Sequence, residues 1–277
     1  MKSTNKKIIL ITGASSGIGK ETALKLIQEG HIVYGAARRV DQMQDLVKTG
    51  GFALKLDVTI EDEIVSGVNQ VLNEQGRIDV LINNAGYGLY GAVEDISIED
   101  AKRQFEVNIF GLARITKEVL PSMRQHKSAR IINISSMGGK MYTPLGAWYH
   151  ATKHALEGWS DCLRLELKQF NIDVVLIEPG ITATDFGIML HEPMLKSSGN
   201  GPYARIAKSV AKATKDSYEK KNAASPATVI SNAISKAIKS HKPKTRYRVG
   251  KFAKPLVWIR LFLGDRIFDK ALMSQVN

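Results

Sequence analysis

The chain has 277 residues, of which 44% are hydrophobic and 24% are charged, and this suits one large globular domain with its own core. No apolar run approaches the ~20 residues of a membrane span, and the lone cysteine, Cys162, excludes an internal disulfide. A net charge of +12 does not choose between nucleic acid, acidic membranes and phosphorylated small molecules. With no secretory signal recognised, we expect a cytoplasmic protein.

Strands and helices are expected to alternate along the chain. Apolar runs that end in turn residues predict strands, and helical spacing of apolar residues predicts helices between them. This alternation predicts one α/β domain over residues 1–277, a Rossmann-type, doubly wound parallel sheet of about seven strands with helices on both faces. The expected strands are residues 7–11, 32–36, 52–56, 80–82, 130–134, 174–177 and 247–249, and the expected helices are residues 19–30, 61–74, 98–123 (ended near Pro121), 147–170 and 226–240.

Two segments depart from the alternation. Residues from about 186 to 224 are rich in Gly, Lys and Ser, and we expect them to form a substrate-loop insertion over a site. Residues from about 251 to 277 mix aromatic, aliphatic and basic side chains, which is typical of a basic amphipathic helix. For this tail we favour packing against its own domain or a partner subunit, and membrane-surface contact and a pocket lid are the alternatives.

The first strand leads into the turn Thr12-Gly13-Ala14-Ser15-Ser16-Gly17-Ile18-Gly19. Its glycines let the backbone turn tightly and approach a ligand closely. The free N–H groups and positive dipole end of the following helix favour a pyrophosphate. The spacing of the glycines differs from G-x-G-x-x-G, but the strand–turn–helix context predicts a dinucleotide site.

The end of the second strand indicates which dinucleotide binds. It reads Ala36-Ala37-Arg38-Arg39, with no acidic residue before Asp41. In this fold an acidic residue at this place holds the ribose 2′-hydroxyl of NAD, whereas an arginine accommodates the 2′-phosphate of NADP. We therefore predict NADP(H) rather than NAD(H), with Arg38 as the first choice for the phosphate, Arg39 as the second, and Ser15 or Ser16 assisting.

Three residues form a candidate catalytic group. Tyr149 and Lys153 are four residues apart on a predicted helix and therefore share a face. Ser136 follows the fifth strand, at the edge where open α/β sheets bind ligands. Since a nearby ammonium favours the phenolate of tyrosine, these side chains are suited to polarise a carbonyl and deliver a proton. We predict no metal site, because His150 and His154 have no further ligands at a usable spacing.

Together with the glycine turn and further motifs, this group resembles the short-chain dehydrogenase/reductase family over nearly the whole chain. The likeness is to the non-extended branch and, loosely, to its steroid and retinol dehydrogenases. The tetrad shows no departure from the family pattern. The matching motifs are Thr12 to Gly19, Asn83-Asn84-Ala85-Gly86, Asn108, Ser136 with Tyr149 and Lys153, and Pro179-Gly180 with Thr184.

The resemblance implies a role for each matching residue. Tyr149 would be the general acid in reduction and the base in oxidation, and Lys153 would lower its pKa and hold the nicotinamide ribose. Ser136 would orient the substrate oxygen, and Asn108 would support a water that links Lys153 to solvent. The other implied cofactor residues are Gly13, Gly17, Ile18 and Gly19 at the turn, Asp57 and Val58 at the adenine, Asn83, Ala85 and Gly86 along the groove, and Pro179, Gly180, Ile181 and Thr184 on the nicotinamide side.

The predicted function is an NADP(H)-dependent oxidoreductase that moves a hydride between the nicotinamide and a carbonyl or alcohol. A regulatory protein that binds NADP(H) without turnover is the alternative, and the intact tetrad argues against it. Relatives commonly form dimers or tetramers, so we expect a homo-oligomer, and we expect no nucleic-acid partner. Apolar residues of the loops after strands four to six favour a lipophilic substrate: Tyr87, Leu89, Met137, Met141, Tyr142, Leu145, Phe186, Ile188, Met189 and Leu190.

Overall fold

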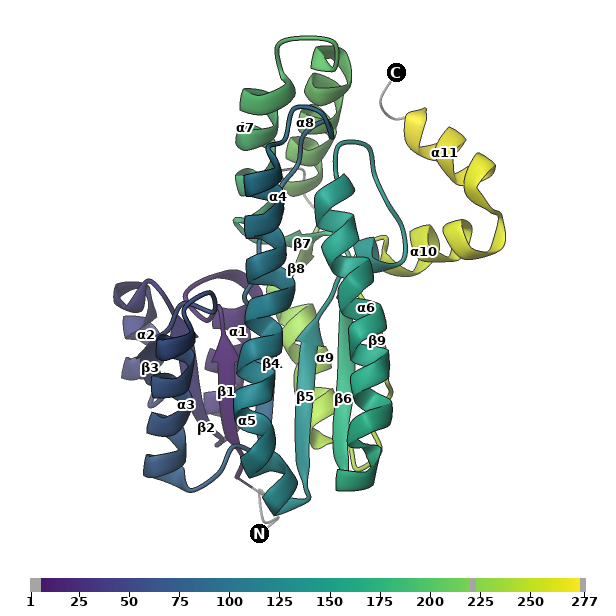
Figure 1. Ribbon diagram of the computed structural model, residues 1–277. Helices are drawn as coiled ribbons and strands as arrows, with labels where there is room; N and C mark the ends of the chain where they lie inside the picture. Colours follow the sequence, from purple (N-terminus) through teal and green to yellow (C-terminus); the bar gives the residue numbers. More distant parts are fainter. Residues whose placement is uncertain (1–5, 220–222, 275–277) are drawn as a thin grey trace.

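A parallel sheet forms the centre of the molecule, and helices cover both of its faces (Figure 1). The computed structural model describes residues 6–219 and 223–274. The strand order is β3-β2-β1-β4-β5-β6-β9, with parallel pairing throughout, which confirms the predicted single-domain, seven-stranded Rossmann-type fold. Between β1 and β4 the order reverses, and ligands of such sheets bind beyond the carboxyl ends of the strands at this point. The strands are β1 (Ile8–Thr12), β2 (Ile32–Ala37), β3 (Phe52–Lys55), β4 (Val80–Asn83), β5 (Ala129–Ile134), β6 (Ile172–Pro179) and β9 (Arg246–Val249).

The two faces of the sheet bury separate sets of side chains. Successive residues of a strand point to opposite faces, so Leu10 packs with α3, α5 and α6, whereas Ile9 and Ile11 pack with α1, α2 and α9. A doubly covered parallel sheet needs strands that are apolar on both sides, and β1 is buried along its whole length. The covering helices are α1 (Gly17–Gln28), α2 (Gln44–Lys48), α3 (Glu61–Gln75), α5 (Leu112–His126), α6 (Ala147–Leu167) and α9 (Ala227–Lys239), and short 3₁₀ turns cover Val40–Met43, Met137–Gly139 and Lys168–Phe170.

The long helical stretch before β5 continues past Pro121. It consists of α4 (Ile98–Phe105), a π-helical turn over Glu106–Gly111, and α5, which ends at His126. The predicted end near Pro121 is therefore wrong. A proline inside a helix removes one backbone hydrogen bond, but here Val119 and Met123 on either side of it are fully buried against the sheet, and this packing holds the helix together.

The segment expected as an insertion is a helical hairpin. α7 (Phe186–Ser198) and α8 (Ala204–Glu219) stand together at the top of Figure 1. They share a small core formed by Met194, Val210 and Ala211. At the base of the hairpin, β7 (Thr182–Ala183) pairs with β8 (Ser225–Pro226). Residues 220–222 of the expected insertion lie outside the described residues, as does the side chain of Ile188.

The C-terminal segment forms two helices rather than one. α10 (Ala253–Phe262) and α11 (Asp265–Met273) meet at Gly264, whose φ of +77° suits glycine and ends the first helix. One side of this hairpin packs on the domain, where Val257 and Phe268 join Met141 in a buried cluster. Across the described residues, no helix has the length and apolar character needed to cross a membrane. Residues 275–277 of the expected tail are not among those described.

Candidate active site

A cavity of about 760 Å³ begins at the glycine turn and extends beneath α7 and α8 to the tail. Its walls come from both halves of the sheet, which agrees with a ligand site at the switch point of the strand order. The structure brings most of the predicted site residues together on these walls. They are Gly13, Ser15, Ser16, Gly17, Ile18, Arg38, Arg39, Asp57, Val58, Ala85, Gly86, Ser136, Tyr149, Lys153, Pro179, Gly180, Ile181 and Thr184.

The glycine turn leaves no room for a side chain at Gly13 and Gly19. Gly13 and Gly17 have φ values of +68° and +54°, which L side chains rarely adopt. A Cβ on Gly13 would lie 2.9 Å from the Cα of Ala85, and a Cβ on Gly19 would lie 2.4 Å from the Gly13 carbonyl oxygen. Gly19 is not among the residues that line the cavity. Its missing side chain instead lets α1 pack closely on the turn.

The start of α1 faces the cavity with its donors free. Ser16 caps the helix without a side-chain hydrogen bond, and the first turn carries no acidic residue. The positive end of the helix dipole is thus not neutralised within the protein. An open helix terminus behind a turn whose glycines carry no side chain fits the pyrophosphate of a dinucleotide.

Two adjacent asparagines hold this edge of the sheet in place. The Asn84 side chain donates hydrogen bonds to the carbonyl oxygens of Thr12 and Gly13, at 3.0 and 3.1 Å, and so ties the turn to the end of β4. Asn83 points into the protein, where its amide donates to Asn133 Oδ1 at 2.9 Å. Asn83 was predicted to line the groove, but it joins β4 to β5 behind the cavity wall. Asn84 was part of the motif and was not assigned a role from the sequence.

Arg38 follows β2 and Asp57 follows β3, and both border the cavity on the side predicted for the adenosine. The Arg38 side chain is 66% exposed, and its guanidinium lies 3.9 Å from the Asp57 carboxylate. Asp57 is itself held by the backbone N–H and hydroxyl of Thr59, at 2.9 and 2.8 Å. The Arg38 guanidinium is therefore loosely paired and accessible to an anion at the cavity edge.

The predicted catalytic side chains meet at the middle of the cavity. The Lys153 Nζ lies 6.0 Å from the centre of the Tyr149 ring and donates to the Ile134 carbonyl oxygen at 2.8 Å. Burial lowers the pKa of Lys153 to about 8, because desolvation disfavours the ammonium, so the group still carries its charge at neutral pH. Ser136 accepts a hydrogen bond from the Gly138 N–H at 3.0 Å, which fixes its hydroxyl beside the cavity.

Asn108 lies behind the cavity, in the π-helical turn before α5. Its amide donates to the Tyr87 carbonyl oxygen and to the Thr152 hydroxyl, at 2.9 and 3.1 Å, and its oxygen accepts from the Tyr87 N–H at 3.1 Å. Asn108 thereby joins the loop after β4 to α6, the helix that carries Tyr149 and Lys153. The extra residue of a π-turn re-aims side chains, and such turns are frequent at functional sites.

His150 is a site residue whose role sequence reasoning missed. It is 5% exposed and borders the cavity beside Tyr149. Its Nε2 accepts from the Thr143 N–H at 3.1 Å, so Nδ1 carries the proton and donates to the Gly138 carbonyl oxygen at 2.9 Å. The Tyr90 hydroxyl, from the loop after β4, lies 3.3 Å from Nε2, so the ring joins that loop to the connection between β5 and α6. Its position next to Tyr149 was the available signal, but Tyr90 belongs to a loop that only the fold brings to it.

The buried imidazole predicts a loss of stability in acid. Burial lowers the pKa of His150 from 6.5 to about 4. The unfolded chain takes up the proton first, so the stability that the neutral ring contributes is complete above pH 6.5 and is lost toward pH 4. We expect His150 to account for a fall of about 2 kcal/mol in the free energy of unfolding between about pH 7 and about pH 5.

Urea unfolding at both pH values measures this fall. His150→Asn should be less stable at neutral pH and should lose less on acidification. His154→Asn, one helical turn further on, is the matched control and should keep the slope of the parent protein. Equal slopes in the parent and in His150→Asn would contradict the assignment.

A buried ion network lies beneath Lys153. Glu157 stands one turn after Lys153 and is 3% exposed at its side chain; it pairs with Lys140 at 3.1 Å and with Arg246 of β9 at 3.0 Å. Arg246 also reaches Asp161 at 2.6 Å and the fully buried Glu178 at 3.3 Å. The Glu157 carboxylate opposes the effect of burial on the pKa of Lys153. The last strand of the sheet therefore supports the helix that carries Tyr149 and Lys153.

Comparisons with known proteins identify the family to which the chain is similar. Residues 7–194 match a protein-family model described as short chain dehydrogenase. Over 272 residues, the chain is 40% identical to the 3-ketodihydrosphingosine reductase of Bacteroides thetaiotaomicron, with 96% of each chain covered. A solved short-chain dehydrogenase from Streptomyces avermitilis superposes with a TM-score of 0.84 at 32% identity and 99% and 97% coverage. The closed form of a serine dehydrogenase complexed with NADP⁺ gives a TM-score of 0.77 at 27% identity, with 89% of this chain and 96% of that chain covered.

Proposed function

The chain belongs to the short-chain dehydrogenase family and is an oxidoreductase, and from this premise we propose that it transfers a hydride between NADP(H) and a lipophilic ketone, aldehyde or alcohol. The observation that carries the proposal is the placement of Tyr149, Lys153 and Ser136 together on the cavity that begins at the glycine turn.

Each catalytic side chain has a distinct task in this proposal. Tyr149 gives its phenolic proton to the substrate oxygen in reduction and takes it back in oxidation. Lys153 stands beside the ring with a charged ammonium, which stabilises the phenolate. Ser136 donates its hydroxyl hydrogen to the same substrate oxygen. The nicotinamide of the bound NADP(H) supplies or accepts the hydride. The glycine turn and the start of α1 hold the pyrophosphate of the dinucleotide.

The preference for NADP(H) is proposed on the charge at the end of β2. Arg38 borders the cavity and is mostly exposed, with Arg39 next to it. Guanidinium groups bind phosphate through paired, charge-assisted hydrogen bonds. Asp57 stands on the same edge but is held by Thr59, which leaves the Arg38 guanidinium as the group for a 2′-phosphate.

The lipophilic substrate is proposed on the walls beyond Tyr149. The relative from Bacteroides thetaiotaomicron is named for a sphingosine-type ketone. In this chain the loops after β4 and β5, the hairpin α7–α8 and the end of α11 enclose that part of the cavity with apolar side chains. They are Leu89, Met137, Met141, Phe186, Met189, Leu190, Val210 and Leu272. Of the other loop residues predicted to line it, Tyr87 does so, whereas Tyr142 and Leu145 lie outside the wall.

A cytoplasmic location and a homodimer or homotetramer also belong to the proposal. Phe110, in the π-helical turn that leads into α5, and Leu165 on α6 are 51% and 70% exposed. Large apolar side chains on two long helices are suited to an interface between copies of the chain.

A panel of ketones and aldehydes with increasing chain length tests the function, with NADPH and NADH measured in parallel. We expect turnover with NADPH, and kcat/KM should rise up to about fourfold for each buried methylene, as the free energy of transfer of ~0.8 kcal/mol predicts. A flat dependence on chain length would overturn the lipophilic substrate. Tight NADPH binding without turnover of any carbonyl would support the regulatory alternative.

A further inference from the structure

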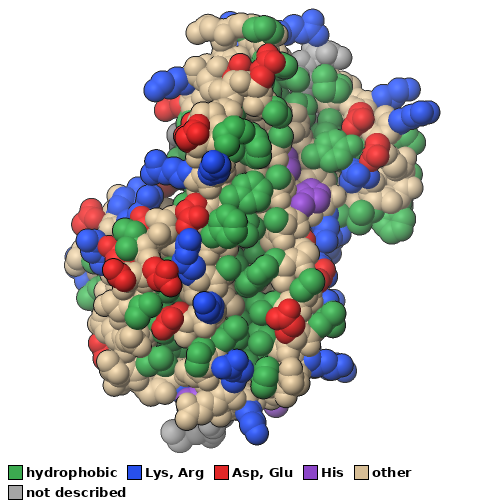
Figure 2. Space-filling view, viewed as in Figure 1, with side chains coloured by type: hydrophobic (Ala, Val, Ile, Leu, Met, Phe, Trp, Pro, Cys, Tyr) green, Lys and Arg blue, Asp and Glu red, His purple; other side chains and the backbone are tan. Residues whose placement is uncertain are grey.

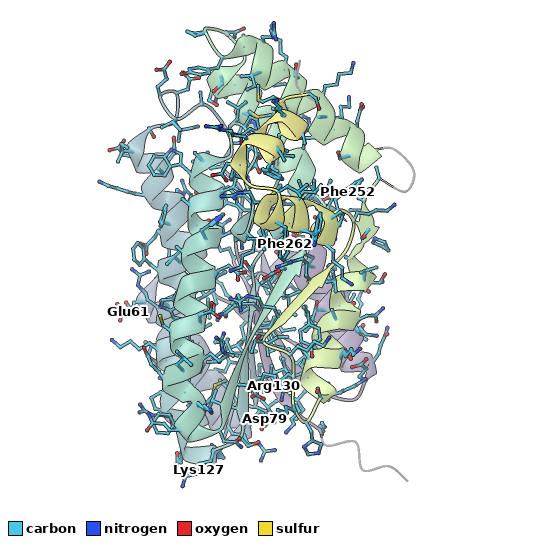
Figure 3. All side chains as sticks on the ribbon, turned by 90° about the vertical axis from the view of Figure 1, so that its right-hand side faces the viewer. Glu61, Asp79, Lys127, Arg130, Phe252 and Phe262 are labelled. Atoms are coloured by element: carbon cyan, nitrogen blue, oxygen red, sulfur yellow. The ribbon has the colours of Figure 1, made fainter. Side chains whose placement is uncertain are left out.

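The outer face of the C-terminal hairpin is apolar and exposed to solvent. We use this name for the exposed side chains of α10, α11 and the turn between them. Figure 2 shows hydrophobic side chains and cations, with acidic side chains among them, on this projecting part at the upper right. Figure 3 shows Phe252 and Phe262 at the two ends of α10. The exposed fractions are 54% for Trp258, 56% for Leu261, 70% for Phe262, 42% for Leu263 and 52% for Ile267.

Packing on the domain does not explain this face. α10 is held by its opposite side, where Val257 is fully buried against Met141 and Phe268. The Trp258 and Phe262 rings lie 5.5 Å apart on the outside, beside a shallow groove bordered by Lys254. The segment is therefore apolar on two sides, and its own domain covers one of them.

The charges around the outer face are cationic. Lys251, Lys254, Arg266 and Lys270 are exposed and form no ion pair with any described residue. The two acidic residues of the hairpin are already engaged, since Asp265 pairs with Arg260 at 2.6 Å and Asp269 accepts the Tyr142 hydroxyl at 2.9 Å. An occupant of this face must match an apolar strip with a basic border.

The charge decides between the possible occupants. A second copy of the chain that met this face with its own hairpin would bring the same cations against the basic border and be repelled there. An anionic bilayer supplies both requirements, because tryptophan and phenylalanine enter the boundary between headgroups and acyl chains while lysine and arginine remain at the anionic headgroups. We propose that the outer face of the C-terminal hairpin docks the protein on an anionic lipid bilayer.

The docked face is continuous with the wall of the active-site cavity. Phe268 of α11 packs in one buried cluster with Met141, which lines the cavity, and Leu272 lines the cavity itself. Docking through the hairpin therefore places the outer end of the cavity beside the bilayer. The membrane contact does not depend on the proposed reaction and is tested without substrate.

Vesicle flotation with the full-length protein tests the proposal. Vesicles of phosphatidylcholine with phosphatidylglycerol should carry the protein, vesicles of phosphatidylcholine alone should carry much less, and added salt should reduce binding.

Trp258→Ser combined with Phe262→Ser should lower the bound fraction about tenfold or more, as the loss of buried aromatic area predicts. Lys254→Glu combined with Arg266→Glu should abolish the preference for the anionic vesicles. Binding to vesicles should shift the tryptophan emission of the parent protein to the blue, because Trp258 enters the bilayer. The Trp258→Phe variant should still bind but should lose this shift.

Val93→Ser combined with Ile98→Ser is the matched control, because these side chains are 61% and 53% exposed on another part of the surface, and it should bind vesicles like the parent. Circular dichroism checks that the variants fold. Equal flotation on both kinds of vesicle, or unchanged binding by the Trp258 and Phe262 variant, would overturn the proposal. The proposal would also be overturned if light scattering found a dimer of the parent protein without lipid and a monomer of the Trp258 and Phe262 variant.

Discussion

Replacement of Tyr149 by phenylalanine is expected to lower kcat about 10³-fold, within the range that a positioned proton donor contributes. The change removes one oxygen atom and keeps the ring, which packs beside Tyr90 and Phe186 at centre distances of 5.9 and 5.6 Å. The fold and the glycine turn should be unaffected, so NADPH should bind as in the parent. Steady-state kinetics and NADPH fluorescence titration measure the two properties separately.

The control for this variant is Tyr87→Phe. Tyr87 also borders the cavity, but its contacts to Asn108 are made by the backbone, which the substitution retains. We expect its kcat to stay close to that of the parent. A Tyr149→Phe variant that keeps more than a tenth of the parent kcat would show that another group delivers the proton.

Reversal of the charge at Arg38 is expected to change the choice of cofactor. A hydrogen bond to a charged group contributes about 1.5–3 kcal/mol, so Arg38→Asp should lower kcat/KM for NADPH about 100-fold. An acidic residue at the end of the second strand is suited to the ribose 2′-hydroxyl, so kcat/KM for NADH should be retained or should rise. The ratio of the two values is the measurement, because it cancels any general effect on activity.

Arg39→Asp provides the comparison for this experiment. Arg39 also borders the cavity and is the second choice for the phosphate. Its reversal should change the cofactor ratio by less than that of Arg38. A ratio that Arg38→Asp leaves unchanged would remove the basis for NADP(H) and leave the family's oxidoreductase activity intact.

Local patterns predicted the regular elements well and their interruptions less well. Apolar runs mark the strands because a doubly covered strand must be buried on both sides. Local sequence patterns do not show whether a proline interrupts a helix. Pro121 and Pro193 lie inside α5 and α7, where neighbouring side chains are buried. The expected single tail helix is two helices, because Gly264 adopts a positive φ.

The sequence alone predicted the sheet and the glycine turn, and it supplied the candidates for the catalytic group. Each of these depends on residues close together in the chain, and their spacing on a strand or helix fixes which side they face. Tertiary structure decided which predicted residues touch the cavity: Asn83 and Asn108 face away from it, and Gly19 serves packing.

Tertiary structure also set the electrostatics of the site and the surface of the tail. Glu157 meets Arg246 across 89 positions of the chain, and the ring of His150, whose pKa burial lowers, is reached by the Tyr90 hydroxyl across 60 positions. Phe268 is buried while Phe262 is bare, although both are aromatic residues of the same segment. Burial and charge pairing are properties of surfaces that come together from distant parts of the chain, and local spacing carries no information about them.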